Sequence, residues 1–274
     1  MSELAMKQPK TKSRFVREFN AIIAILARDI TIFFKSPGAI ISSFAMPLVM
    51  MGMLGGSLAQ NMAGGLNFEY GPFMMVGMLV NMLFMTTIMG MTSLVEDRMT
   101  DFTQEMMISP ISRYSIVIGK NFGSSFGAII GMIGTLIVGL IMGITLEVHQ
   151  LLMIFVLSPF ICLSAGAVAI SIMGIAKDNR TANIAVMLVT MPQMFLSGAI
   201  IPINNSSGVL YVLSRIMPMT YSLDLMRAVV YAGTPEYGNV ILFNPTTSIA
   251  VIIAITIVGL VIGTFLFARS EKNR

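Results

Sequence analysis

Six long runs of mostly apolar residues account for most of this chain and restrict it to one broad class of fold. Crossing a hydrocarbon core of about 30 Å takes roughly 20 apolar residues in a helix. None of the runs holds an aspartate, glutamate or arginine in its middle, and Lys120 lies near the end of one. We therefore predict an all-α polytopic membrane protein with six transmembrane helices, at about 38–58, 72–95, 117–146, 151–176, 182–203 and 246–268.

The overall composition agrees with this class and excludes an ordinary soluble domain. Charged residues make up 11% of the chain and hydrophobic residues 55%, with a mean hydropathy of +0.84, whereas soluble domains carry about 25% charged residues. The one cysteine, Cys162, lies in an apolar run, so neither a disulfide nor a CxxC metal site is expected. The net charge of +4 follows the membrane topology and predicts no nucleic-acid partner.

The basic residues predict the orientation of the chain. An even number of spans puts both termini on one side, and if that side is the cytoplasm, 15 of the 17 lysines and arginines lie inside. Only Arg215 and Arg227 then lie outside, which fits the positive-inside rule. We expect a cell-membrane protein with a cytoplasmic segment 1–37, a transmembrane domain 38–268 and a cytoplasmic tail 269–274.

The segment before the first span predicts an amphipathic helix at the membrane surface. Apolar residues recur at helical spacing from Phe15 to Phe33. The opposite side carries the basic residues Arg14, Arg17, Arg28 and Lys35. Such a helix would meet anionic headgroups with its basic side and enter the acyl boundary with its apolar side. The alternative is a soluble helix folded against the rest of the protein. No cleavable signal peptide is evident, because the first apolar run is long and begins far from the N-terminus.

Residues 96–120 form a polar island between the second and third predicted spans. On a helix, its acidic residues fall in one stripe and its apolar residues on another face. The stripe holds Asp97, Asp101 and Glu105, and the apolar face holds Met99, Phe102 and Met106. Ser109-Pro110 should end this helix, and Ser112 can cap the next one. A short acidic amphipathic helix between two spans suits docking into a groove of a partner protein, so 96–116 is interpreted as a cytoplasmic loop with that role.

Two of the predicted spans carry faces rich in methionine. The second span places on one face Met74, Met78, Met82, Met85 and Met89, with Asn81 at the edge. The fifth span places on one face Asn183, Met187, Thr190, Met191, Met194 and Gly198, beside Pro192. Methionine is unbranched and polarizable, so such faces can adapt to apolar guests of different shapes. The alternative is ordinary packing between helices.

The segment 204–245, between the last two spans, is too polar in places for a span and too apolar for a solvated loop. Its short helical stretches are broken by Pro218 and Pro235, which predicts re-entrant or interfacial helices. Asp224 and Arg227, three residues apart, could neutralise each other there.

Two separated groups of residues resemble one known family. The first group is Glu96-Asp97-Arg98, Ser109-Pro110-Ile111-Ser112-Arg113 and Gly119-Lys120. The second group is Leu196-Ser197-Gly198, Pro202, Leu210, Pro218-Met219-Thr220-Tyr221-Ser222-Leu223-Asp224, Arg227 and Gly233. They resemble the coupling-helix loop and the C-terminal signature of type-2 ATP-binding-cassette (ABC) exporter permeases, of the drug-exporter kind. Their order, and the number of spans between them, extend the resemblance over the whole chain.

The resemblance implies roles for three sets of residues. Coupling to an ATPase is implied for Glu96, Asp97, Asp101, Phe102, Glu105, Met106, Ser109, Pro110 and Arg113. Lining of a translocation path at a dimer axis is implied for Met78, Asn81, Met82, Met85, Met89, Met187, Thr190, Met191 and Met194. A cap over the outer end of the path is implied for the segment 204–245, with Pro218, Tyr221, Asp224 and Arg227.

The chain carries no ATP-binding motif of its own. The GxxxxGK[ST] pattern is absent, since Gly119-Lys120 is followed by Asn121. We therefore expect ATP and Mg²⁺ to be bound by a separate ABC ATPase subunit, and this chain to have no cofactor, metal site or catalytic residue. The other expected partners are a second permease subunit, in a homodimer or heterodimer, membrane lipid and an amphipathic substrate.

These features together predict the permease subunit of an ATP-driven exporter. The apolar lining and the absence of charge inside the spans favour an amphipathic or lipid-like substrate, such as a drug or an antimicrobial compound. The main alternative is export of a polysaccharide or glycolipid by a similar permease. An ion-coupled secondary transporter usually needs ionisable groups near the midplane, and a non-transporting scaffold or immunity protein would have no use for the coupling loop. His149, alone in an outer loop, does not indicate a hydrolase.

Overall fold

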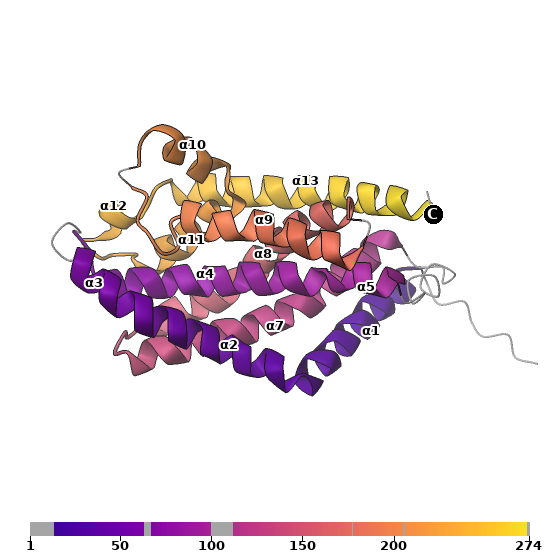
Figure 1. The fold of residues 1–274 in the computed structure, drawn as a ribbon, viewed down its shortest axis with the longest axis horizontal. Coiled ribbons are helices and arrows are strands. Elements are labelled where there is room, and N and C mark those ends of the chain that lie inside the picture. Colours follow the sequence, from indigo (N-terminus) through magenta and orange to yellow (C-terminus); the bar gives the residue numbers. More distant parts are fainter. Residues whose placement is uncertain (1–13, 63–66, 100–111, 177, 205, 273–274) are drawn as a thin grey trace, which may run out of the picture.

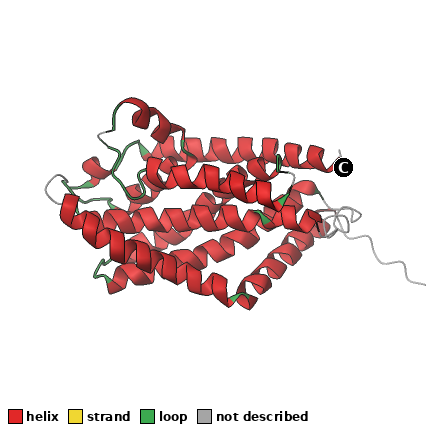
Figure 2. Ribbon diagram, viewed as in Figure 1, coloured by secondary structure: helices red, strands yellow, loops and turns green. Residues whose placement is uncertain are grey.

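The computed structural model describes residues 14–62, 67–99, 112–176, 178–204 and 206–272, and every regular element in these ranges is a helix (Figure 2). The long helices lie side by side along the length of the molecule; the short helices α3, α10, α11 and α12 lie toward one end, and the short α5 lies toward the other (Figure 1). The elements are α1 (Arg14–Lys35), α2 (Pro37–Val49), the π-helical η1 (Met50–Gly55), α3 (Gly56–Met62), α4 (Tyr70–Met91), α5 (Ser93–Met99), α7 (Arg113–Ile141), α8 (Val148–Met173), α9 (Asn179–Leu196), α10 (Gly208–Ile216), α11 (Pro218–Val230), α12 (Tyr237–Val240) and α13 (Pro245–Lys272).

Five helical stretches of the described residues are long and apolar enough to cross a membrane. They are Pro37–Leu58, Tyr70–Asp97, Arg113–Ile141, Val148–Met173 and Tyr237–Phe267. Each overlaps one of the predicted spans; most boundaries differ by a few residues, and the last stretch begins nine residues before the predicted 246–268. The all-α membrane class predicted from the apolar runs is therefore confirmed, with a matching helix for five of the six predicted spans.

The remaining predicted span, 182–203, overlaps α9, which begins at Asn179 and is shorter than expected. The helix ends at Leu196, because Gly198 adopts a φ of 86° and turns the chain. Only a glycine enters this left-handed region readily. The apolar residues after the turn, Ala199 and Ile200, are buried inside the protein and do not extend the helix. The first turn of α9 also carries polar residues, so this helix does not join the five long apolar ones.

The helix α4 lies at the centre of the bundle. Every residue from Phe73 to Phe84 is buried. One side of α4 packs against α7 and another against α8, and α13 covers α8 from outside. Close packing depends on Gly77, since a Cβ there would lie 1.8 Å from the carbonyl oxygen of Ala199. The turn after α9 is thereby held directly against the central helix.

The N-terminal helix α1 packs along α7 and forms a corner with α2 (Figure 1). Two glycines of α7 permit this approach: a Cβ at Gly123 would lie 2.6 Å from Asp29 Oδ2, and one at Gly127 would lie 3.1 Å from the Phe33 ring. The other face of α1 exposes large apolar side chains, including Phe15 and Phe19. The helix is thus amphipathic, and one of its faces is folded against the rest of the protein.

The helix α7 begins where the sequence predicted. Ser112 has an extended backbone, and its Oγ accepts a hydrogen bond from the backbone N–H of Tyr114 at 3.3 Å. Its own N–H donates to Glu18 Oε2 at 2.8 Å, which ties the start of α7 to α1. The predicted cap is therefore confirmed.

Candidate functional site

A cavity of about 890 Å³ lies between α1, α2, α4, α5 and α7. Met194 of α9 also contributes to its wall. The cavity opens to the surface, because several of its lining side chains, such as Met46, Met89 and Glu96, are exposed. Its volume falls in the range of sites for small molecules, about 300–1,000 Å³.

The side of the cavity formed by α4 is lined by part of the predicted methionine stripe. Met82, Met85 and Met89 contribute to this wall, and Met89 is 61% exposed. Met78, one turn further along the same face, is buried in the core and does not line the cavity. The stripe on α4 therefore divides between a core segment and a cavity segment, and Met78 belongs to the core.

The methionine face of α9 lies mostly apart from this cavity. Met187 and Met191 line a separate shallow hollow of about 340 Å³, together with Ile184, Leu188 and Pro192. Thr190 is buried, and its Oγ1 donates to the Val186 carbonyl at 2.8 Å. Within one copy of the chain, Met194 is the residue of the predicted α9 set that shares a cavity with the α4 residues.

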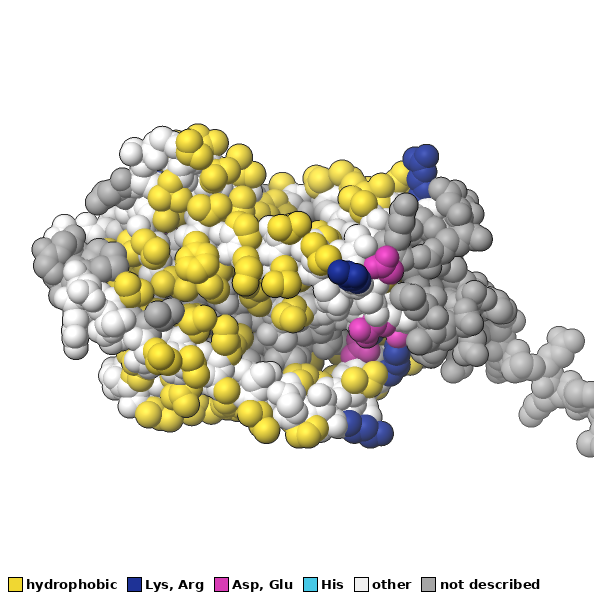
Figure 3. Space-filling view, viewed as in Figure 1, with side chains coloured by type: hydrophobic (Ala, Val, Ile, Leu, Met, Phe, Trp, Pro, Cys, Tyr) yellow, Lys and Arg dark blue, Asp and Glu magenta, His cyan; other side chains and the backbone are white. Residues whose placement is uncertain are grey.

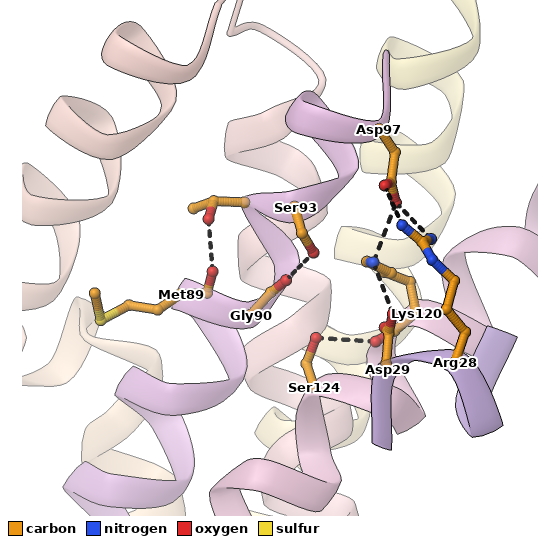
Figure 4. A network of polar contacts seen from close by, with 9 residues as sticks. Arg28, Asp29, Met89, Gly90, Ser93, Asp97, Lys120 and Ser124 are labelled. Atoms are coloured by element: carbon orange, nitrogen blue, oxygen red, sulfur yellow. Dashed lines mark hydrogen bonds and ion pairs between the residues drawn. The ribbon is translucent and has the colours of Figure 1, made fainter. Parts of the chain in front are cut away.

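One end of the cavity is charged and is built from three helices (Figure 4). Arg28 of α1 donates two hydrogen bonds to Asp97 of α5, at 2.6 and 3.1 Å. Lys120 of α7 lies between two carboxylates, with its Nζ 3.0 Å from Asp29 Oδ1 and 3.1 Å from Asp97 Oδ2. The Lys120 side chain is only 3% exposed. We call these four residues the charge cluster; it joins α1, α5 and α7.

The two α1 members of the charge cluster, Arg28 and Asp29, both have raised pKa values, which favours the charged form of the arginine and the neutral form of the aspartate. The hydrogen bond to Asp97 raises the pKa of Arg28 above its usual value, so this side chain stays protonated. Burial raises the pKa of the Asp29 carboxyl, and the nearby Lys120 opposes this shift without cancelling it. Asp29 therefore depends on Lys120 to stay ionised.

The cavity wall also contains a polar group with no hydrogen-bond partner among the described residues. Asn81 is 8% exposed and lines the cavity next to Met82. Its Nδ2 is buried and makes no hydrogen bond to the part of the chain that the structure describes. An unsatisfied buried amide costs free energy, so such a group calls for an explanation.

The residues predicted to couple to an ATPase are only partly described. Asp101, Phe102, Glu105, Met106, Ser109 and Pro110 lie outside the described residues. Glu96 is exposed, and Arg113 is half-buried at the start of α7. Asp97 differs from the sequence prediction of an outward acidic stripe, because it is buried and paired with Arg28 and Lys120. Helical periodicity alone could not distinguish an acidic side chain facing a partner protein from one facing a cation in its own chain.

The predicted outer residues gather on and around α11. Pro218 occupies the first turn of α11. The Tyr221 hydroxyl donates to the Arg215 carbonyl at 2.7 Å. The Asp224 carboxylate accepts from the backbone N–H groups of Leu242 and Phe243, at 2.6 and 3.1 Å.

Arg227 is fully buried, and it interacts with neutral groups. Its Nη2 donates to the Gly198 carbonyl at 2.7 Å, and its guanidinium lies 3.6 Å from the centre of the Phe73 ring. The sequence suggested that Asp224 and Arg227 could neutralise each other; their opposite charges do attract each other, but the two side chains are not in direct contact. They make no ion pair; Asp224 holds the chain before α13, and Arg227 holds the turn after α9.

The sequence analysis did not identify Asp29 as a site residue, and it did not predict that Lys120 pairs with the carboxylates of Asp29 and Asp97. A signal was available: Asp29 is an acidic residue in a helix otherwise rich in apolar and basic residues, and Lys120 is a lysine within an apolar run. Charges of opposite sign in such positions are usually paired, because unpaired buried charge is costly.

Two comparisons with known proteins bear on this arrangement. The family model described as "ABC-2 type transporter" matches residues 20–231, which is most of the chain and includes the cavity, the charge cluster and the helices α10 and α11. Nodulation protein J of Rhizobium meliloti (strain 1021) is similar to this chain, with 40% identity over 48 residues. That match covers 18% of each of the two proteins.

Proposed function

The chain belongs to the ABC-2 type transporter family, and from this premise we propose that it exports an amphipathic or lipid-like compound, such as a drug or antimicrobial, across the cytoplasmic membrane. Members of this family are membrane components of ABC transporters and work with an ATPase subunit. In this proposal a separate ABC ATPase binds ATP and Mg²⁺, and the present chain supplies the path.

The observation that carries the proposal is the cavity of about 890 Å³ beside the central helix. Its walls combine methionines from three helices with a polar and charged end. An amphipathic molecule needs both environments at once, and flexible methionine side chains can accommodate different apolar bodies.

An amphipathic substrate suits this lining better than a polysaccharide or glycolipid does. Sites for sugars commonly place aromatic rings against the sugar faces, and Phe33 is the one aromatic residue among the described residues that line the cavity. Export of a polysaccharide or glycolipid therefore remains the second candidate.

We propose that α9 completes a six-span layout with both termini in the cytoplasm. The distribution of basic residues supports this orientation. The charged side chains visible in Figure 3 gather at the end of the molecule where α5 and the C-terminal end of α13 lie, whereas apolar side chains are spread over the middle of that face. In this layout α1 rests at the inner surface of the membrane, and α10 and α11 lie in an outer re-entrant region.

A second permease subunit is part of the proposal. The exposed apolar face of α9, with Met187, Leu188 and Met191, supports a contact with another copy or with a related chain. Such a contact would bring the methionine faces of two α9 helices together at the axis. A path between two subunits would then be lined by the methionines of both α4 and α9, most of which line separate cavities within one subunit.

The coupling mechanism follows from the arrangement of α5. In this proposal ATP binding drives two ATPase subunits together, and the predicted coupling segment near 97–108, which begins within α5, receives this movement. Because α5 directly follows α4 and shares the charge cluster with α1 and α7, a push on α5 is passed to all three helices. The cavity between them then changes from inward-facing to outward-facing.

A double substitution in the predicted docking face tests this proposal. Phe102→Ala with Met106→Ala should leave the protein inserted and folded but abolish transport and ATPase stimulation, because truncating two interface anchors can cost a few kcal/mol. The measurement is substrate-stimulated ATP hydrolysis by the permease reconstituted with its ABC ATPase subunit.

Phe122→Ala, which removes an exposed ring from α7, is the matched control and should retain activity. Transport at the normal rate by the double variant would show that this loop is not the coupling element.

A further inference from the structure

We propose that Asn81, in the cavity beside α4, selects a guest that carries a hydrogen-bond acceptor oxygen within its apolar body. This inference rests on the proposed function, because it names a chemical feature of the amphipathic compound that the cavity would export. It is argued from the unsatisfied amide of Asn81, from the hydroxyl groups of the same wall and from the position of Asn81 along α4.

The Asn81 amide lies in the cavity wall as a hydrogen-bond donor without an acceptor. The residue is 8% exposed, and its Nδ2 makes no hydrogen bond to the described part of the chain. Two other asparagines in described helices do satisfy this group. Asn61 Nδ2 donates to the Ser57 carbonyl, one turn earlier in its own helix, at 2.8 Å. Asn121 Nδ2 donates to the Leu163 carbonyl of a neighbouring helix at 3.3 Å. Since Asn81 makes neither kind of bond, its donor is left for a guest.

The other buried, uncharged polar side chains of the described lining offer no such donor. They are those of Ser43 and Ser124. Ser43 Oγ donates to the Ala39 carbonyl at 2.8 Å. Ser124 Oγ donates to the Lys120 carbonyl at 2.9 Å. Because a hydroxyl has one proton to donate, both serines have already used their donor within their own helix. A guest oxygen buried against this part of the wall would therefore pair with Asn81.

Asn81 lies at the end of the cavity that is far from the charge cluster. On α4 the lining residues begin at Asn81 and continue to Gly90, and α5 adds Asp97. These residues belong to one helical stretch, Tyr70–Asp97, and at 1.5 Å per residue Asn81 and Asp97 are about 24 Å apart along it. A guest whose polar head lies at the charge cluster thus places its apolar body beside Asn81. The acceptor is therefore expected within that body and away from the head.

The neighbours of Asn81 in the wall are apolar, so the hydrogen bond can distinguish one guest from another. Met82 is adjacent, and Met85 lies one turn along the same face of α4. A plain hydrocarbon chain would contact both methionines and leave the amide unsatisfied, whereas an ether, ester or ketone oxygen would accept its hydrogen bond. Nδ2 itself is shielded, and the unbranched side chain of Met85 can move to admit the guest oxygen.

Two isomeric ether alcohols test this assignment, because they contain the same atoms and differ in the place of the ether oxygen. In ω-hexyloxydodecanol the ether oxygen lies within the chain, and in hexadecyloxyethanol it lies next to the hydroxyl group. Each is titrated into the purified full-length permease in nanodiscs, without an ATPase, and binding to empty nanodiscs is subtracted. We expect ω-hexyloxydodecanol to bind at least about threefold more tightly, which is within the range of one net hydrogen bond.

Asn81→Leu removes the donor and keeps a side chain of similar size. It should reduce the preference between the isomers to less than about twofold. It should leave the unfolding temperature unchanged or raise it, since the variant loses an unsatisfied buried polar group. Asn61→Leu, at an exposed position of α3 outside the cavity, is the matched control and should retain the preference of the parent protein.

Equal binding of the two isomers by the parent protein would overturn the proposal. So would failure of both isomers to bind a permease that unfolds at its normal temperature. A preference that survives in Asn81→Leu would assign the selection to another residue, and a lower unfolding temperature of this variant would show that the amide has a structural partner; either result also refutes the assigned role.

The failure of this inference can be told apart from the failure of the proposed function. Equal binding of the isomers by a permease whose ATP-driven transport is intact would remove the role of Asn81 alone. A clear preference in a permease that no ATPase drives would remove the proposed function and keep the binding site.

Discussion

Replacing Lys120 with methionine is expected to destabilise the folded protein by about 3–5 kcal/mol, the usual cost of removing one partner of a buried ion pair. Lys120 Nζ lies 3.0 Å from Asp29 and 3.1 Å from Asp97. At an effective dielectric constant of about 20, each such contact contributes roughly 5 kcal/mol of attraction before desolvation is subtracted. Methionine has a side chain of similar length, so the loss of stability in Lys120→Met measures the loss of the charge more than a loss of packing.

Arg28→Met is the comparison variant. The Arg28 side chain is 32% exposed, and without it Asp97 would keep its contact with Lys120. We expect a loss of about 1 kcal/mol or less, as for a partly solvated pair. The free energy of unfolding of each variant is measured in the same detergent. Unfolding is monitored by size-exclusion chromatography or by intrinsic fluorescence. An equal loss for the two variants, or a loss below about 1 kcal/mol for Lys120→Met, would refute the reasoning that the buried lysine holds the charge cluster together.

The pH dependence of Lys120→Met provides an independent check. Burial already raises the pKa of Asp29, and loss of the neighbouring lysine should raise it further. A carboxyl whose pKa is raised in the folded state destabilises the protein at pH values above that pKa. This penalty shrinks as the pH falls and the native carboxyl takes up a proton. The difference in stability between Lys120→Met and the parent protein should therefore be larger at pH 8 than at pH 5, and a difference that grows on acidification would contradict the assignment.

Three further predictions concern the cavity, the topology and the core. Met82→Leu, in the cavity wall, should change the relative stimulation of ATP hydrolysis by different substrates. Met78→Leu, in the core, should leave this stimulation unchanged and lower the free energy of unfolding by under about 1.5 kcal/mol. Equal effects of the two substitutions would place both residues in the same environment. In a cysteine-free background, a cysteine at Asn61 should react with an impermeant reagent from outside sealed cells and one at Asp178 should not; outside labelling at 178 would overturn the six-span layout. Gly77→Ala should sharply reduce the amount of folded protein, because its Cβ would collide with a backbone carbonyl; normal yield would show that the turn after α9 can move away.

The positions of the long helices were largely predictable from the sequence. An apolar run of 20 or more residues has few alternatives to a helix, because lipid offers no partners for backbone polar groups. The predicted run 246–268, for example, corresponds to α13, Pro245–Lys272. The end of α9 was not predictable in this way. The residues after Ser197 remain apolar, and composition does not reveal that Gly198 adopts a left-handed conformation and turns them into the core.

The candidate site was only partly predictable, because its decisive contacts are long-range. Periodicity identified the face of α4 that reaches the cavity, but it did not separate Met78 from Met82, whose environments differ in the packing of neighbouring helices. It also assigned Asp97 to an outward stripe. The partner Arg28 lies 69 residues away in the chain and Lys120 lies 23 residues away, and a helical projection contains neither of them.

The charge cluster also constrains the order in which the chain can assemble during synthesis. Asp29 is made 91 residues before Lys120. At about 5–20 residues per second, the aspartate waits roughly 5–20 s for its lysine. During this interval α1 keeps the carboxylate hydrated if it stays at the boundary between lipid and water. The docking of α1 onto α7 therefore cannot be completed before α7 is made, and the nascent protein passes through a stage in which its first two spans, Pro37–Leu58 and Tyr70–Asp97, have been made before its first helix is docked.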